Sequence, residues 1–279
     1  MLRMSLLEHM EELRARIIWM LGGVAAAFAI SLTFCSELWL IVQAPAEKAL
    51  TELGIDPPHP SAINTMDQFN IIYVKLPILV SIFIASPWIL YQIWSFVAPG
   101  LYPAERKWCA PFVCTAAGLF IFGGLFAYFE IFPRAIVFLL GIGRDVKITP
   151  IVSLSDYFDL FVNVILGVGL IFETPIVIFF LTLLHLVTPQ FLLRNSRYAI
   201  LLIAVIAALL TPTGDAINLT LLAVPMIFLY YVGAFASWIL VLNRDHRAFA
   251  WKKILIAISI VALAGALAIQ LAKRMGWLR

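Results

Sequence analysis

The amino-acid sequence predicts an all-α protein that crosses a membrane several times. Hydrophobic residues make up 63% of the 279 residues and charged residues only 13%, whereas soluble domains carry about 25% charged residues. The mean hydropathy is +1.01, and the apolar residues gather in runs, most of them near the roughly 20 residues that a helix needs to cross a bilayer core. The candidate spans are residues 17–41, 71–91, 110–132, 157–186, 198–210, 217–242 and 254–271.

The segment before the first span, SLLEHMEELRARI, predicts an amphipathic helix over residues 5–16. Ser5 followed by Glu8 fits a capping box, so the helix should start at residue 6. No small-residue cleavage pattern follows the apolar run, so we expect this leader to remain in the mature protein. Glu12 can pair with Arg16 one turn later, for a few tenths of a kcal/mol. An apolar stripe that can lie on the membrane or on the protein comprises Leu6, Met10, Leu13 and Ile17.

Lysine and arginine are unevenly distributed among the predicted loops. They gather in the leader and in the second, fourth and sixth loops, and are fewer in the odd-numbered loops. By the positive-inside rule, this asymmetry places the amino terminus in the cytoplasm. We therefore expect a multi-pass protein of the cytoplasmic membrane. The net charge of +3 includes no compact basic patch, so nothing points to nucleic acid.

Two loops on the opposite side have features of their own. The first, around residues 44–69, is long, acidic and rich in proline. The third contains the apolar stretch RAIVFLLGIG directly after Pro133. This stretch is either a short helix packed on the rim of the protein or the frayed end of the third span.

The segment SPWILYQIWSFVAPGLYPAERK, residues 86–107, should hold a helix end and a polar turn. Pro99 breaks the helix, and Tyr102 and Glu105 then form the turn beside Trp94. Trp94, Tyr102 and Trp108 also suit an aromatic belt at the membrane interface. The residue types alone leave both interpretations open.

Two ionisable residues fall inside predicted spans. Glu173 lies about midway along the fourth span, next to Pro175, which can bend the helix. Because an isolated carboxylate in hydrocarbon is costly, Glu173 should be neutral, hydrogen-bonded or beside a hydrated cavity. Lys75 lies near the outer end of the second span, within reach of the interface by snorkelling. A proton-coupled secondary transporter using Glu173 and Lys75 is one function that this pattern allows.

The fifth span is too short for an ordinary bilayer. Residues 198–210 cover about 20 Å as a helix, against about 30 Å for the hydrocarbon core. Pro212 and Gly214 then turn the chain, and Asp215 can cap the next helix. The mismatch must be relieved by thinner lipid or by partner helices that cover the gap.

Five motifs occur in an order and spacing that resemble the twin-arginine translocase subunit TatC over about residues 5–245. The resemblance implies a six-helix, glove-shaped bundle. It also implies a receptor for signal peptides that carry two consecutive arginines, on proteins exported in the folded state, without catalytic chemistry. The motifs are EHMEELRARI, SPWILYQIWSFVAPGLYPAERK, FAYFEIFP, FETP and LTPTGDAINLTLLAVP.

The resemblance also implies a binding site at the cytoplasmic surface. Glu12 and Glu105 match the two acids that bind the signal peptide. Carboxylates suit this role because arginine presents a planar fork of donors to them. The residues that would shape or flank the groove are Phe96, Pro99, Leu101, Tyr102, Arg14 and Arg16.

The resemblance places Glu173 in a concave cup of the bundle and predicts single-span partners, TatA and TatB, at the outer ends of spans five and six. Leu219 departs from a commonly polar position of the family, and the TPTGD turn is one residue longer than usual. Further copies of the chain and membrane lipids are the other expected partners. The predicted partner-binding residues are Leu209, Thr211, Asp215 and Leu219.

The chain continues beyond the resemblance. We divide it into a membrane domain, residues 1–245, and an extension, residues 246–279, whose apolar run 254–271 is long enough for a seventh spanning helix. Basic clusters flank both ends of this run, so the charge rule does not orient it; if it spans, the carboxyl terminus is external. The cysteines and histidines have no metal-ligand spacing, and the hydrolase motifs GxSxG and HExxH are absent from the sequence. We therefore expect no metal, no cofactor and no enzymatic activity, and we take from the resemblance that transport draws on the proton-motive force.

Overall fold

The structure is a computed structural model that describes residues 6–55, 58–97, 109–141, 152–211 and 216–244. These residues are almost entirely helical, and their one β-type contact is an isolated bridge between Ser61 and Ser153. The all-α prediction is confirmed. The chain divides into two compact units, Met1–Ser237 and Trp238–Arg279, and all the contacts described below lie within the first.

Five helical stretches of the described chain are long and apolar enough to cross a membrane, and a sixth apolar helix is shorter. This confirms a polytopic protein whose fifth span is short. The predicted seventh span, residues 254–271, lies outside the described residues. The five long stretches are Leu7–Leu32, Thr65–Val97, Pro111–Gly141, Leu154–Leu183 and Asn218–Leu242, and the short one is Ser196–Leu210.

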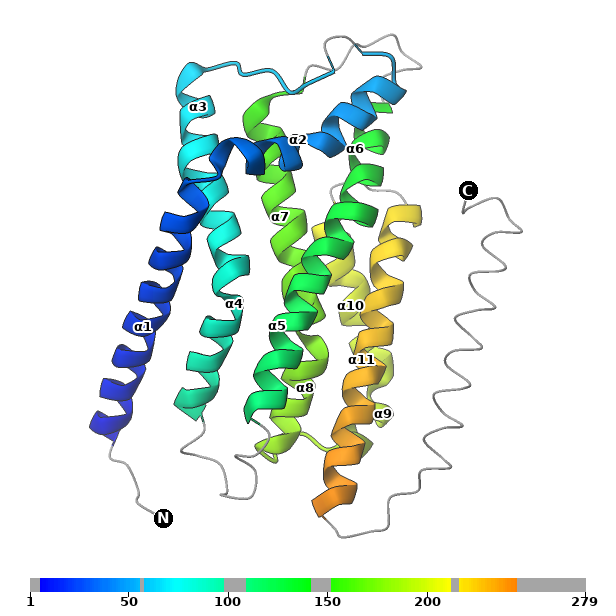
Figure 1. Cartoon of the computed structure of the whole chain (residues 1–279). Coiled ribbons are helices and arrows are strands. Elements are labelled where there is room, and N and C mark those ends of the chain that lie inside the picture. Colours follow the sequence, from blue (N-terminus) through cyan, green and yellow to red (C-terminus); the bar gives the residue numbers. More distant parts are fainter. Residues whose placement is uncertain (1–5, 56–57, 98–108, 142–151, 212–215, 245–279) are drawn as a thin grey trace. The chain divides into compact units, whose positions relative to one another are not determined.

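The leader and the first span form one helix, and its described part is α1 (Leu6–Leu32). The predicted end of this span at residue 41 is wrong, because a tight turn at Thr33 and Phe34 starts a separate helix, α2 (Cys35–Glu52). Figure 1 shows α2 lying across the upper end of the bundle. Much of the predicted first loop is therefore helical. Hydropathy could not reveal the turn, since apolar residues continue on both sides of it.

The second span consists of α3 (Thr65–Asn70), the π-helical segment η1 (Ile71–Lys75) and α4 (Leu76–Val97). Helix α4 packs extensively on α1. Gly23 of α1 makes this possible, because a Cβ there would lie 2.3 Å from the Trp88 ring. The Trp88 indole donates to the Trp19 carbonyl of α1 at 2.8 Å.

The third span runs through α5 (Cys109–Phe126), the π-helical segment η4 (Ala127–Ile131) and α6 (Phe132–Gly141). The stretch after Pro133 therefore continues the span, and a separate rim helix is wrong. This continuation is packed rather than frayed, because Ala135 and Ile136 are buried and α6 contacts α2.

The fourth span is broken at Glu173 into α7 (Leu154–Phe172) and α8 (Thr174–Leu183). It is followed by the short helix α9 (Pro189–Arg194), α10 (Ser196–Leu210) and α11 (Ala216–Arg244). The break follows from Pro175, whose missing N–H would otherwise bond to the Ile171 carbonyl. The Thr174 hydroxyl donates to that carbonyl instead, at 2.5 Å.

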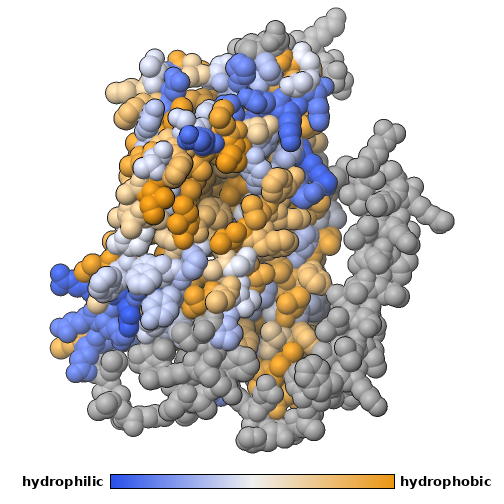
Figure 2. Space-filling model, viewed as in Figure 1, coloured by the Kyte–Doolittle hydropathy of each residue, from blue (hydrophilic) through white to orange (hydrophobic). Residues whose placement is uncertain are grey.

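The core of the bundle is aromatic where α7 meets the third span. Phe132 packs edge to face on both Tyr157 and Phe161, with ring centroids 5.0 Å apart for Phe132 and Phe161. Where α5 crosses α7, a Cβ on Gly123 would lie 3.1 Å from the Cα of Gly169. On the face shown in Figure 2, hydrophobic side chains fill the middle and hydrophilic ones gather towards both ends, including the lower end of α1.

Candidate functional site

The predicted site residues are divided between described and undescribed parts of the chain. Glu12, Arg14 and Arg16 lie on the first turns of α1, and Phe96 lies near the end of α4. Figure 1 shows these two helix ends at the same lower end of the bundle. The other predicted groove residues lie outside the described residues and are Pro99, Leu101, Tyr102 and Glu105.

Glu12 is part of a polar network between α1 and α4. Its Oε1 lies 3.4 Å from Nη2 of Arg16, and Nη1 of Arg16 donates to Oε1 of Gln92 at 3.1 Å. The Glu12 side chain is 17% exposed, and Gln92 is 3% exposed. The second carboxylate oxygen of Glu12 is buried and has no hydrogen-bond partner among the described residues. Buried carboxylate oxygens are normally hydrogen-bonded, so this one marks a place for a donor.

An aromatic contact also joins α1 to α4 at this end. The rings of His9 and Phe96 stack with centroids 4.4 Å apart and planes 13° from parallel. His9 lies on α1 one turn before Glu12, so Phe96 lies close to the carboxylate network. The predicted membership of Phe96 in a groove beside Glu12 is compatible with this geometry.

Trp94 does not belong to an interfacial belt. It is 1% exposed and packs on Phe112 of α5 and Phe180 of α8, with ring centroids 4.5 Å and 6.1 Å away. The other residues considered for a belt, Tyr102 and Trp108, lie outside the described residues. Trp94 therefore anchors the end of α4 in the core.

Lys75 has a direct partner in the bundle. Its Nζ lies 2.7 Å from Oδ1 of Asp159 on α7, and the two side chains are 40% and 57% exposed. Snorkelling alone therefore does not account for this lysine. Asp159 and Glu173 are both on the fourth span, and Glu173 comes 14 positions after Asp159, a rise of about 21 Å along a helix.

Glu173 is partly buried and lies at the junction of α7 and α8. The junction is expected there because Pro175, two residues later, breaks the helix. One of its carboxylate oxygens is buried and has no hydrogen-bond partner in the described part of the chain. Its backbone carbonyl accepts from the N–H groups of Ile176 and Val177. The carboxylate thus sits at a kink with unused hydrogen-bonding capacity.

The predicted partner-binding residues differ in exposure. Leu209, near the end of α10, is 81% exposed. Thr211 is 7% exposed, and its hydroxyl donates to the Ala207 carbonyl of the same helix at 2.7 Å. Leu219 is partly buried on α11, and Asp215 lies outside the described residues. Of the three described positions, Leu209 has the largest exposed fraction.

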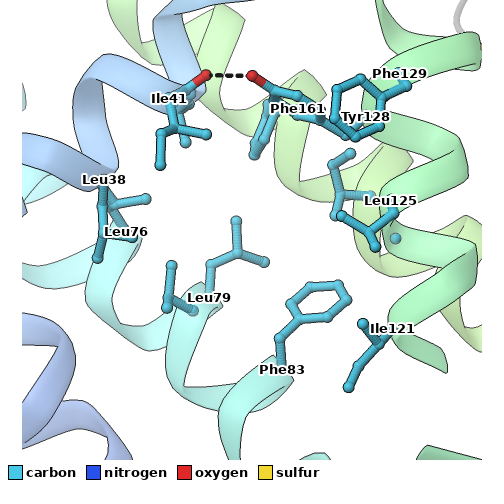
Figure 3. A pocket seen from close by; sticks show the side chains of 14 residues that line it. Leu38, Ile41, Leu76, Leu79, Phe83, Ile121, Leu125, Tyr128, Phe129 and Phe161 are labelled. Atoms are coloured by element: carbon cyan, nitrogen blue, oxygen red, sulfur yellow. Dashed lines mark hydrogen bonds between the residues drawn. The ribbon is translucent and has the colours of Figure 1, made fainter. Parts of the chain in front are cut away.

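A hollow of about 330 Å³ lies below α2, between α4, α5 and α7. Figure 3 shows the apolar side chains that face it, with the Tyr128 hydroxyl donating to the Ile41 carbonyl at 2.8 Å. That carbonyl lacks its usual helical donor, because the residue four positions later is Pro45. A second tyrosine, Tyr157, donates to the neighbouring Val42 carbonyl at 2.5 Å. Two hydroxyls therefore fasten α2 to the bundle.

Comparison with known proteins decides the family. Residues 8–225 match the family model of the Sec-independent protein translocase protein (TatC). The chain belongs to the TatC family. A TatC protein of Koribacter versatilis is 43% identical over 227 residues, 81% of this chain and 82% of the relative. A TatC of Carboxydothermus hydrogenoformans is 36% identical over 84% of this chain and 93% of the relative.

A solved TatC structure agrees with the fold described above. The crystal structure of a twin-arginine translocase receptor, TatC, superposes with a TM-score of 0.68 at 32% identity, over 83% of this chain and 99% of the solved chain. The predicted family and fold class are therefore confirmed. Membership in the TatC family makes this chain a component of a protein translocase.

Sequence reasoning missed two polar residues that complete these networks. Gln92 and Asp159 each stand in a predominantly apolar run, and that placement was the only signal they gave. Their partners are 76 and 84 residues away along the chain, respectively. Among the described residues, no group of three or more potential ligands is placed to hold a metal ion.

Proposed function

We propose that this chain is the membrane receptor and core scaffold of a twin-arginine translocation system that exports folded proteins. Its ligand is a signal peptide with two consecutive arginines, and its amino terminus lies in the cytoplasm. The orientation is supported by the lysine and arginine asymmetry of the loops. The observation that carries the proposal is the carboxylate of Glu12, which is partly desolvated and has a buried, unpartnered oxygen.

The chemistry of this carboxylate suits an arginine. An exposed ion pair contributes under about 1 kcal/mol, too little to select a peptide. A guanidinium held by two parallel bonds in a partly buried site contributes more and adds geometric selectivity. Glu105 is proposed as the second carboxylate, and Phe96, stacked on His9 beside the network, as an apolar wall that limits water.

A binding assay tests the proposal. The full chain in detergent is titrated against a fluorescent synthetic signal peptide with two arginines and an apolar segment. Glu12→Gln and Glu105→Gln should each weaken binding by at least about tenfold, because each removes a charge-assisted contact. Glu11→Gln is the matched control, since it removes an exposed carboxylate one residue away on the same helix. Undiminished binding by the double variant would refute the site.

We further propose that TatA- and TatB-like single-span partners dock beside α10. Helix α10 has 15 residues and is about 22 Å long, which leaves about 8 Å of a bilayer core unspanned. Neighbouring helices can relieve such a mismatch, and the exposed Leu209 would contact them. A photocrosslinker at position 209 should capture a single-span partner in membranes, and a crosslinker at the buried Ile203 should not.

The alternative of a proton-coupled transporter gains no support from its two residues. Lys75 is paired with Asp159, about 21 Å along the fourth span from Glu173. The two ionisable groups therefore do not form a common site. Solute uptake by the purified chain in liposomes, without partners, is the result that would revive this alternative.

A further inference from the structure

Arg16 makes an incomplete contact with Glu12. A guanidinium can give a carboxylate two parallel hydrogen bonds. Here a single contact is present, from Nη2 to Oε1 at 3.4 Å, and the second carboxylate oxygen is left buried and unpartnered among the described residues. Because the two side chains are one helical turn apart on α1, closer pairing would be expected unless something else held the guanidinium.

Gln92 of α4 holds it. Its Oε1 accepts from Nη1 of Arg16 at 3.1 Å, and the glutamine is 3% exposed. A buried amide oxygen requires a donor, and Arg16 is the donor that the described residues supply. The guanidinium is therefore shared between two helices and cannot turn both of its terminal nitrogens to Glu12.

We propose that Gln92 is a positioning residue that keeps Arg16 from bonding to the second oxygen of Glu12, so that an arginine of the signal peptide can bond to it. This inference rests on the proposed function. Arg16 offsets part of the charge of Glu12 in the free receptor but leaves one oxygen unused. An incoming guanidinium binds that oxygen without first breaking a two-bond internal pair. Gln92 thus sets how strongly the receptor's own arginine competes with the ligand.

The neighbouring groups are compatible with this arrangement. On α1, His9 is stacked on Phe96, and Glu11 and Arg14 are exposed. On α4, Trp94 is buried against Phe112 and Phe180. Among the described residues that face the network, Arg16 is therefore the cation that competes for Glu12.

The test is a double-mutant cycle on the full chain in detergent, with the fluorescent two-arginine peptide as the probe. Gln92→Leu fills the same buried space but removes the acceptor. It should weaken binding by about fivefold to tenfold, because Arg16 then closes on both oxygens of Glu12. Combining it with Arg16→Met should restore binding to within about twofold of Arg16→Met alone, since no internal competitor remains.

Two controls separate positioning from packing. Gln92→Glu keeps an acceptor facing Arg16 and should bind at least as tightly as the parent chain. Gln43→Leu removes a different glutamine, one hydrogen-bonded to Glu47 on α2, and should leave binding unchanged. An equal loss from Gln92→Leu with and without Arg16 would overturn the inference, as would parental binding by Gln92→Leu.

Glu12→Gln separates a failure of the proposed binding site from a failure of the positioning role of Gln92. If it binds the peptide as tightly as the parent chain, the proposed site at Glu12 fails and the positioning role fails with it. If Glu12→Gln weakens binding while Gln92→Leu does not, only the positioning role is overturned.

Discussion

One of the two hydroxyls that fasten α2 to the bundle, that of Tyr128, compensates for a proline. The Ile41 carbonyl has no helical donor because Pro45 stands four residues later, and the Tyr128 hydroxyl donates to it at 2.8 Å. Tyr128→Phe removes this donor and keeps the ring against the hollow below α2. Pro45→Ala supplies an N–H in the position where the helix needs one. The two substitutions should therefore not be additive.

The expected magnitude is that of one hydrogen bond. The net contribution of one hydrogen bond to the free energy of unfolding is about 1 kcal/mol, and leaving its acceptor without a partner costs about 1–3 kcal/mol where water is excluded. The hydrogen bond between Tyr128 and Ile41 borders the apolar hollow but is exposed. We therefore expect Tyr128→Phe to lower the free energy of unfolding by about 1 kcal/mol. For a chain of this size that lowers the thermal midpoint by roughly 2–4 °C. In the Pro45→Ala background, the same change should cost less than about 0.5 kcal/mol.

Thermal unfolding of the purified chain in one detergent, followed by tryptophan fluorescence, measures all four members of the cycle. Tyr73→Phe is the control, because this tyrosine is 48% exposed and its hydroxyl makes no hydrogen bond within the described residues. It should leave the midpoint unchanged. If Tyr128→Phe lowers the midpoint equally with Pro45 and with Ala at position 45, the compensation is refuted.

Two further substitutions test the packing and the ion pair. Gly123→Ala should lower the thermal midpoint by several degrees, because its Cβ would lie 2.8 Å from the Cβ of Phe172 and α5 and α7 would have to separate. Gly118→Ala is the control on the same helix, because a Cβ there meets nothing within 4 Å. An equal loss from both substitutions would contradict the close packing of α5 on α7. Lys75→Met should cost less than about 1 kcal/mol, since both partners are substantially exposed. Exchanging Lys75 and Asp159 should recover the loss in the same assay, and failure to recover it would show that the pair is not the cause.

Composition and hydropathy were sufficient to predict much of the architecture. Apolar runs of membrane length must become helices, because lipid offers no hydrogen bonds to the backbone. The short fifth span and the helical leader followed from equally local features. The resemblance of five motifs to TatC identified the family, since motif order and spacing survive changes elsewhere in a sequence. These properties depend on residues close together in the chain.

The tertiary structure decided what local patterns could not. The turn at Thr33 and Phe34 lies within continuous hydrophobicity, so only the packing of α2 across the bundle ended the first span. Gln92 and Asp159 acquire their roles from partners 76 and 84 residues away, and no periodicity encodes such distances. The sequence by itself determined that Glu12 and Arg16 share a face of α1. Whether they pair fully depended on a third side chain from α4, because a hydrogen bond is settled by which donors and acceptors meet in space.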